Sequence, residues 1–154
     1  MSDSGNEKID FYNNNIFREN INFTFNLTNV QNINNIIHSI KTTSCGTDDI
    51  SINMIKYCSP FIDIYILHII NSCIELHYFP DAWKVAIGKP LAKNNNPKTF
   101  SDLRIISILP VLSKILERIL HDQIYSYFTE NNLLPDNQCG FRKNFKTATA
   151  LTTV

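Results

Sequence analysis

The sequence predicts an α+β fold that is mostly helical and includes one antiparallel β-hairpin. Apolar residues recur at i, i+3 and i+4 in several segments, which is typical of amphipathic helices. Between these segments, two short β-branched runs flank an asparagine-rich loop, which is typical of a hairpin. Hydrophobic residues make up 44% of the 154 residues and aromatic residues 11%, so the chain has enough apolar material for a core and wholesale disorder is not expected.

The chain is expected to hold one domain, or a piece of a larger one. Residues 1–27 are polar and asparagine-rich, and we expect them to form a mobile lead-in. The domain proper is expected to cover residues 28–154. Its first helix is predicted over 28–41, where Thr28 and Gln31 resemble a capping box.

Two further helices are predicted before the hairpin, one from about 49 or 51 to 57 and one over 61–77. The latter is expected to begin with Ser59 as its cap and Pro60 as its first helical residue. Isoleucine and leucine occur on most of its faces, so we expect this helix to be largely buried. In the turn that follows the first helix, Gly46 is the residue best suited to a positive φ.

The two expected strands, 83–93 and 103–108, form a hairpin of about 84–108 with a long loop. Five basic residues lie along it: Lys84, Lys89, Lys93, Lys98 and Arg104. By the two-residue period of a strand, Arg104, Ile106 and Ile108 share one face. The second strand leads directly into the next helix.

That helix is predicted over about 110–129, with Pro110 in its first turn. The apolar stripe is expected to comprise Leu112, Ile115, Leu116, Ile119, Leu120 and Ile124. The polar face is expected to comprise Ser113, Lys114, Glu117, Arg118, His121 and Asp122. A last helix is expected from about Thr147, and because the sequence stops inside it we expect a truncated chain.

The charges balance overall but are unevenly distributed. Residues 1–80 hold four basic and eight acidic side chains, whereas residues 81–154 hold ten and six. A basic half of this kind favours a polyanionic partner. Ordinary surface charge explains the same asymmetry, so both interpretations stay open.

The four cysteines do not form a recognisable metal or disulfide pattern. No two of them are spaced as Cys-x-x-Cys, and the histidines do not cluster near them, which argues against a structural zinc site. The N-terminus is polar and does not resemble a signal peptide. The most apolar run, 61–76, is too short and too polar to span a membrane. We therefore expect a soluble intracellular protein of the cytoplasm or nucleus, without a membrane partner.

The adjacent carboxylates Asp48 and Asp49 are a candidate metal site, because paired aspartates hold divalent ions in phosphoryl transfer. Adjacent aspartates before an apolar helical run are more often turn and N-cap residues. A third carboxylate, which such a metal site usually needs, has no obvious candidate. The turn interpretation is preferred.

Arg104 is a candidate phosphate-binding residue. Its guanidinium is a permanently charged, planar fork that binds phosphate through two hydrogen bonds. The alternative is an arginine at a strand edge that pairs with Asp102 or Glu117, and the residues alone leave both open. Lys93, beside the loop, is a weaker candidate because an exposed lysine is usually only solvated.

The segment 138–143, Gln-Cys-Gly-Phe-Arg-Lys, combines a glycine, an aromatic ring and two cations. Single-stranded nucleic acids are held by aromatic side chains that stack on bases and by cations that follow the backbone. The alternative is a loop that Phe141 anchors to the core. No serine or cysteine stands at a spacing from a histidine that would suggest a nucleophile–base pair.

Five motifs in order resemble the reverse transcriptase domain of non-LTR (LINE-type) retrotransposons, specifically its N-terminal part. They are 46–50 (Gly-Thr-Asp-Asp-Ile), 79–84 (Phe-Pro-Asp-Ala-Trp-Lys), 104–109 (Arg-Ile-Ile-Ser-Ile-Leu), 113–118 (Ser-Lys-Ile-Leu-Glu-Arg) and 138–143. Each motif alone is weak, but their order and spacing together are specific. The resemblance covers about residues 28–154.

The resemblance implies the fingers, with the start of the palm, of a right-hand polymerase. Arg104 would then bind the triphosphate of the incoming deoxynucleotide, and Lys93 would be the basic residue on the opposite strand. Contacts to an RNA or DNA template–primer would come from Gln138, Gly140, Phe141 and Arg142. Mg²⁺ is expected for the complete family domain and no cofactor for this fragment.

The sequence departs from the family pattern at three places, where Ile105 replaces a proline, Asp49 a glycine and Lys146 a serine. The family's catalytic aspartate motifs are absent from these 154 residues, so no catalytic or metal-binding residue is assigned. We expect a fragment of an RNA-directed DNA polymerase that is inactive alone. A non-enzymatic nucleic-acid-binding or interaction remnant is the alternative, and a partly unfolded relic without function is a third possibility.

Overall fold

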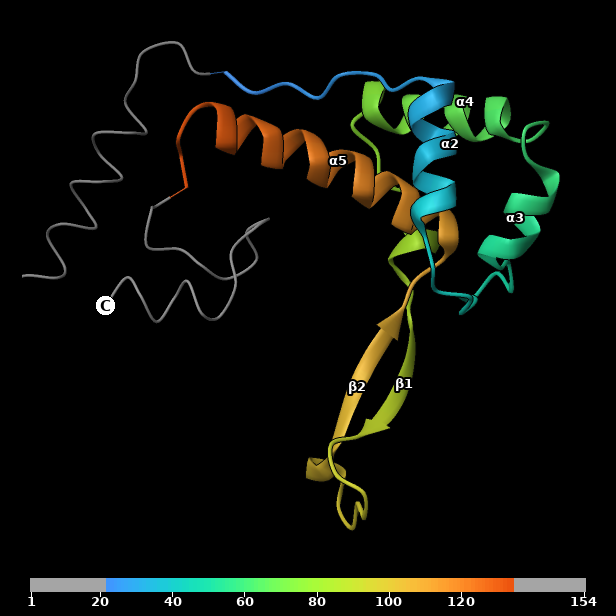
Figure 1. The fold of residues 1–154 in the computed structure, drawn as a ribbon, viewed down its shortest axis with the longest axis vertical. Coiled ribbons are helices and arrows are strands. Elements are labelled where there is room, and N and C mark those ends of the chain that lie inside the picture. Colours follow the sequence, from blue (N-terminus) through green and yellow to red (C-terminus); the bar gives the residue numbers. More distant parts are fainter. Residues whose placement is uncertain (1–21, 135–154) are drawn as a thin grey trace, which may run out of the picture. The chain divides into compact units, whose positions relative to one another are not determined.

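The computed structural model describes residues 22–134 (Figure 1). Residues 25–122 form one compact unit, and the features described below belong to it unless stated otherwise. Most of the expected lead-in and the helix expected from Thr147 lie outside the described residues. No helix in the part of the chain that the structure describes has the length and apolar character needed to cross a membrane.

The described residues combine helices with a two-stranded antiparallel sheet, which is consistent with the predicted α+β class. In chain order the elements are α2 (Val30–Ser39), α3 (Ile52–Cys58), α4 (Asp63–Glu75), a 3₁₀ turn (Asp81–Lys84), β1 (Ile87–Ala92), a second 3₁₀ turn (Phe100–Asp102), β2 (Leu103–Ile108) and α5 (Val111–Glu130). The second strand has its predicted bounds. The first is shorter than predicted, because residues 81–84 form the 3₁₀ turn.

The cap of α2 differs from the prediction. The N-cap is Asn29, whose side chain accepts the Asn32 N–H at 2.9 Å, so the capping box expected from Thr28 and Gln31 does not form. Thr28 instead joins the N-terminal segment to α4. Its N–H donates to the Asn71 side chain at 2.9 Å, and its carbonyl accepts from the same side chain at 3.1 Å.

Helix α4 begins at Asp63, three residues after Pro60, so Ser59 and Pro60 are not its cap and first residue. Ser59 donates its hydroxyl to the Asp63 carboxylate at 2.9 Å, and Asn34 of α2 donates to the same oxygen at 2.9 Å. The Asp63 side chain is fully buried at the helix N-terminus, where the helix dipole favours a negative charge. This cluster ties the start of α4 to α2.

The expectation that α4 is largely buried is wrong. One face enters the core through Ile66, Ile70 and Ile74. The other face is apolar as well but exposed, with Tyr65 70% exposed. Apolar residues on most faces of α4 therefore did not mean that each face is buried.

The core lies between α2, α3, α4 and the first half of α5. Its buried members are Ile33, Ile36, Ile37, Ile52, Ile55, Ile66, Ile70, Cys73, Ile74, Val111, Ile115, Leu116 and Ile119. Full burial of an aliphatic side chain of this size contributes about 1.5–3 kcal/mol. Isoleucine at helical spacing on four helices thus supplies most of the packing.

The predicted stripe of α5 is confirmed at Ile115, Leu116 and Ile119 and differs at two positions. Ser113 was expected on the polar face but is fully buried, and its hydroxyl donates to Glu117 at 2.9 Å. That bond satisfies the serine, which removes the main cost of burying it. Ile124, expected in the stripe, is exposed.

Gly46 contacts the junction between the hairpin and α5, and it does so without a positive φ. No described glycine has a positive φ, and the left-handed position in this turn is Asp49, with φ 56°. A Cβ at Gly46 would lie 2.5 Å from the Pro110 nitrogen and 2.9 Å from the Leu109 carbonyl carbon. Glycine is needed because the two backbones approach so closely.

Replacing Gly46 with alanine should therefore lower the free energy of unfolding of the full chain by about 1–3 kcal/mol, because the backbone at Pro110 cannot yield as a side chain can. Denaturant unfolding measures this. Gly88→Ala is the matched control. Its Cβ would meet only an Ile105 methyl at 3.3 Å, and we expect a change below about 0.5 kcal/mol. Equal effects of the two substitutions would contradict the close-approach account.

Candidate nucleic-acid interface

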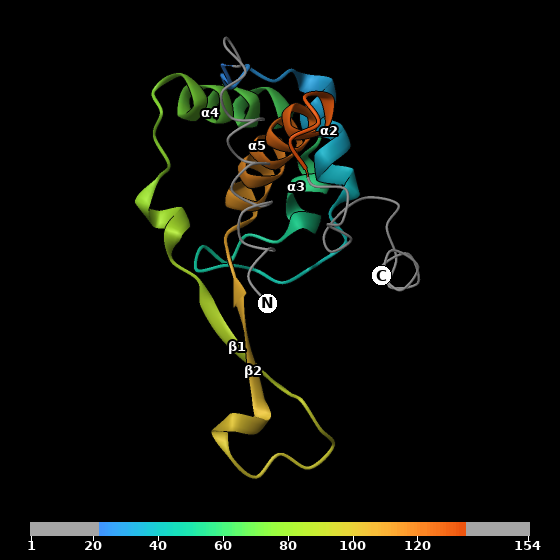
Figure 2. The ribbon, with the colours of Figure 1, turned by 90° about the vertical axis from the view of Figure 1, so that its left-hand side faces the viewer.

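The hairpin carries the sequence-predicted candidates Arg104 and Lys93. Both views of the ribbon show β1 and β2 leaving the helices, with the connecting loop at the far end (Figures 1 and 2). The register places Arg104 opposite Leu91 and Ile106 opposite Lys89. Directly opposed residues share a face of the hairpin, and so do residues two apart on one strand. Lys89 and Arg104 are therefore diagonal neighbours on one face, with Cα atoms roughly 7–8 Å apart. The predicted common face of Arg104, Ile106 and Ile108 fits this register.

The backbone pairing explains why β1 can contain a proline without losing a hydrogen bond of the ladder. The Lys93 N–H donates to the Asp102 carbonyl at 2.8 Å, which fixes the parity of the ladder. Because hydrogen-bonded and non-hydrogen-bonded pairs alternate, the pair Pro90 and Ile105 is non-hydrogen-bonded. Pro90 therefore costs the ladder no donor. The N–H that Ile105 restores, relative to the family proline, points away from the ladder.

Lys93 is bound to the loop rather than merely solvated. Its Nζ donates to the Ser101 carbonyl at 2.7 Å. An ammonium group has three donors, so two remain for another acceptor. Lys93 lies opposite Asp102, and Asp102 precedes Arg104 by two residues on the other strand. The hairpin therefore brings Lys93 and Arg104, the two predicted phosphate-binding residues, to neighbouring positions.

Asp102 organises the loop with its carboxylate. One oxygen accepts from the Lys98 N–H at 2.9 Å, from the Thr99 N–H at 3.0 Å and from the Thr99 hydroxyl at 3.0 Å. The other faces the Asn94 amide at 3.4 Å. These hydrogen bonds, led by that from Lys98, lower the pKa of Asp102. Its negative charge is thereby committed to the loop backbone.

Arg104 does not pair with either predicted carboxylate. Asp102 is occupied by the loop, and Glu117 accepts from Ser113. Within residues 22–134 no carboxylate lies at ion-pair distance from Arg104. Lys84, by contrast, pairs with Asp81 at 2.7 Å, and this hydrogen bond raises the pKa of Lys84. The hairpin face that carries Lys89 and Arg104 is therefore left with uncompensated positive charge.

Lys89 and Phe100 are candidate residues that the sequence interpretation did not single out. Lys89 joins Arg104 only through the cross-strand register, which a single sequence does not give. Phe100 lies in the 3₁₀ turn at the hairpin tip and is 93% exposed. In the sequence, the signal that could have pointed to Phe100 is an aromatic residue in a loop that also carries lysines.

The Asp48 and Asp49 pair has the geometry of a turn. The Asp48 carboxylate accepts the Ile50 N–H at 3.2 Å, and Asp49 has a left-handed backbone. Among the described residues no group of three histidine, cysteine or acidic side chains could hold a metal ion. The predicted template contacts Gln138, Gly140, Phe141 and Arg142 lie outside the described residues.

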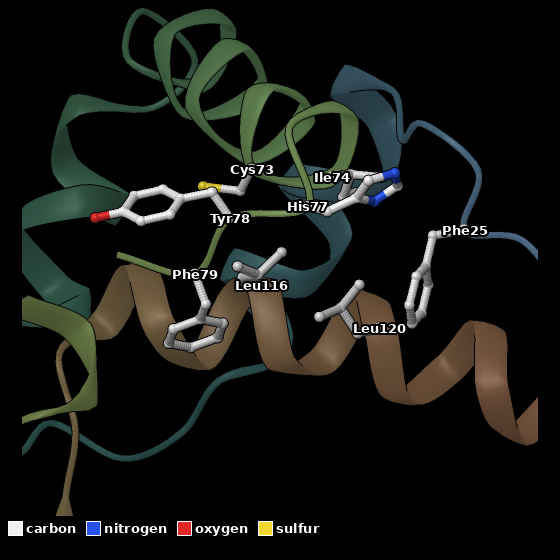
Figure 3. Close-up of a pocket in the computed structure, with 8 residues that line it drawn as sticks. All are labelled: Phe25, Cys73, Ile74, His77, Tyr78, Phe79, Leu116 and Leu120. Carbon is white, nitrogen blue, oxygen red and sulfur yellow. The ribbon is translucent and has the colours of Figure 1, made fainter. Parts of the chain in front are cut away.

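A pocket of about 220 Å³ lies apart from the hairpin, between α4 and α5. Leu116 and Leu120 point from α5 toward Cys73 and Ile74 of α4 (Figure 3). Burial raises the pKa of the Cys73 thiol, which disfavours the reactive thiolate. The pocket is mostly apolar and lacks a lysine or arginine, so it does not suit a phosphate.

Sequence comparison identifies the class of proteins to which this chain is related: RNA-directed DNA polymerases of non-LTR transposons. The chain is 31% identical over 123 residues to the probable RNA-directed DNA polymerase from transposon BS of Drosophila melanogaster, which covers 75% of this chain. It is 35% identical over 80 residues, or 51% of the chain, to the probable RNA-directed DNA polymerase from transposon X-element of the same organism. It is 36% identical over 75 residues, or 48% of the chain, to the RNA-directed DNA polymerase from mobile element jockey, also of Drosophila melanogaster. The resemblance drawn from the motifs is confirmed.

The chain spans only a small part of these relatives, namely 13%, 9% and 8% of their lengths. No family model matches the chain. No solved structure matches it.

The ladder parity predicts that Ile105→Pro leaves the hairpin intact, because the N–H it removes has no partner in the ladder. Ile106→Pro is the matched control and should open the hairpin, because Ile106 belongs to a hydrogen-bonded pair with Lys89. Amide hydrogen exchange at Leu91 and Lys93 measures the difference. Fast exchange in both variants would contradict the assigned parity.

Proposed function

We propose that the chain forms the fingers, with the start of the palm, of a reverse transcriptase of the non-LTR retrotransposon type, over residues 28–154. Its hairpin would contact the incoming deoxynucleoside triphosphate and its C-terminal part the template–primer. The observation that carries the proposal is the uncompensated positive face of the hairpin. The relatives are named as RNA-directed DNA polymerases, which supports the choice of substrates.

Arg104 is proposed to bind the triphosphate. It is exposed, lies on a paired strand and has no carboxylate partner among the described residues, so its guanidinium fork is available. Lys89, diagonal to it on the same face, adds a second charge. Lys93 adds a third, and its bond to Ser101 fixes its ammonium group near the loop.

Gln138, Gly140, Phe141 and Arg142 are proposed to contact the template–primer. The composition of this segment, with an aromatic face and cations, supports the assignment.

Mg²⁺ would serve nucleotidyl transfer in the complete family domain. The residues that the structure describes do not form a donor set that fits it. The described residues are therefore proposed to bind and orient nucleotide and template, and no metal-bound step is assigned to them.

The proposal predicts that Arg104→Ala weakens binding of a deoxynucleoside triphosphate to the full chain on a primer–template about 10- to 100-fold. Each charge-assisted hydrogen bond contributes about 1.5–3 kcal/mol, and 1.4 kcal/mol is a factor of ten. Titration of the nucleotide against a fluorescent primer–template complex measures the effect. Arg118→Ala is the matched control: it removes the same charge from α5, where Arg118 pairs with Asp122 at 3.0 Å.

Binding of the primer–template itself should weaken with salt, because phosphate contacts release counterions. Arg142→Ala should weaken it at each salt concentration.

If Arg104→Ala and Arg118→Ala affect nucleotide binding alike, the assignment of Arg104 fails. Binding of nucleic acid without any binding of nucleotide would favour the non-enzymatic alternative.

A further inference from the structure

Phe100 stands at the tip of the hairpin with almost no protein around it. It is 93% exposed, more than any other described large hydrophobic side chain. Phe100 opens the 3₁₀ turn Phe100–Asp102, which lies between the loop and β2. Burial does not explain a phenylalanine at this position, because the folded chain gains almost no apolar contact from it.

The backbone that carries Phe100 is held in place. Thr99 and Asp102 form a reciprocal capping box around the turn, and the Asp102 carboxylate also accepts from the Lys98 N–H. Lys93 closes the other side through its bond to the Ser101 carbonyl. The backbone under Phe100 is therefore ordered before any partner arrives, which lowers the entropic cost of binding.

The surroundings of Phe100 carry positive charge. Lys98 precedes it by two residues, Lys93 bonds the residue that follows it, and Arg104 lies four residues after it. The one carboxylate in this loop, Asp102, is occupied by backbone donors. The tip therefore presents an aromatic ring among cations, and its charge is complementary to a polyanion.

We propose that the hairpin tip binds a single-stranded nucleic acid, with the Phe100 ring stacked on one unpaired base and Lys98 beside the adjoining phosphate. This inference rests on the proposed function, which supplies a polynucleotide partner, and it adds a contact distinct from the triphosphate contact at Arg104. Base–aromatic stacking is tolerant of sequence, because every base has a π-face. The tip would thus hold a strand without reading it.

The test measures binding of the full chain to labelled strands of about ten nucleotides, within the site sizes of known single-strand binders. The strands are oligothymidylate, oligouridylate and an abasic strand of the same length and charge. Phe100→Ala should weaken binding to both base-bearing strands about tenfold, the effect expected for one lost stack, and leave the abasic strand unchanged. Phe100→Tyr should restore binding, because the ring is retained.

Phe61→Ala is the matched control, because Phe61 is 84% exposed and lies before α4 rather than on the hairpin. It should bind all three strands as the unsubstituted chain does. Equal binding by Phe100→Ala and the unsubstituted chain would overturn the stacking proposal and leave the proposed function intact. An equal loss on the abasic strand would also overturn it, because that loss does not involve a base. Failure of the unsubstituted chain to bind any strand or primer–template would overturn both.

Discussion

The position of the hairpin depends on a backbone contact at its base. Gly46 lies against Leu109 and Pro110, at a distance that no side chain allows. The same turn is held from α5, where the Lys114 ammonium reaches the Ser44 carbonyl at 3.5 Å. Because Pro110 is also buried, the end of β2 and the start of α5 are fixed against the helical core. The hairpin can therefore present its charges from a rigid support.

The charges of the hairpin are available because its one acidic residue is engaged elsewhere. Asp102 accepts hydrogen bonds from the loop, which lowers its pKa and keeps it ionised. An exposed ion pair with Arg104 would have contributed little, whereas four bonds within the loop fix its shape. One residue thus orders the tip and leaves Arg104 unpaired. Conversely, Lys84 is paired with Asp81 and is not a candidate for binding.

The sequence predicted the hairpin and the stripe of α5 well, because both depend on local periods. It did not predict close approaches between distant segments. The role of Gly46 is set by Pro110, which lies far along the chain. The burial of Ser113 was not predicted either, because a serine counts as polar in a helical pattern, and its local bond to Glu117 satisfies the buried hydroxyl. Arg104 was predicted with its partner open, because the loop hydrogen bonds that occupy Asp102 cannot be read from the sequence. Lys89 was missed because only the cross-strand register brings it beside Arg104. Family motifs predicted a role for Arg104 that the hydrophobic periods could not.

The central claim is that one face of the hairpin binds phosphate. It is tested most directly by mapping amide chemical shifts of the ¹⁵N-labelled full chain while a deoxynucleoside triphosphate is added. We expect the largest changes at Lys89, Leu91 and Arg104, which share that face. Changes centred instead on the pocket between α4 and α5, or no changes on the hairpin at saturation, would contradict it.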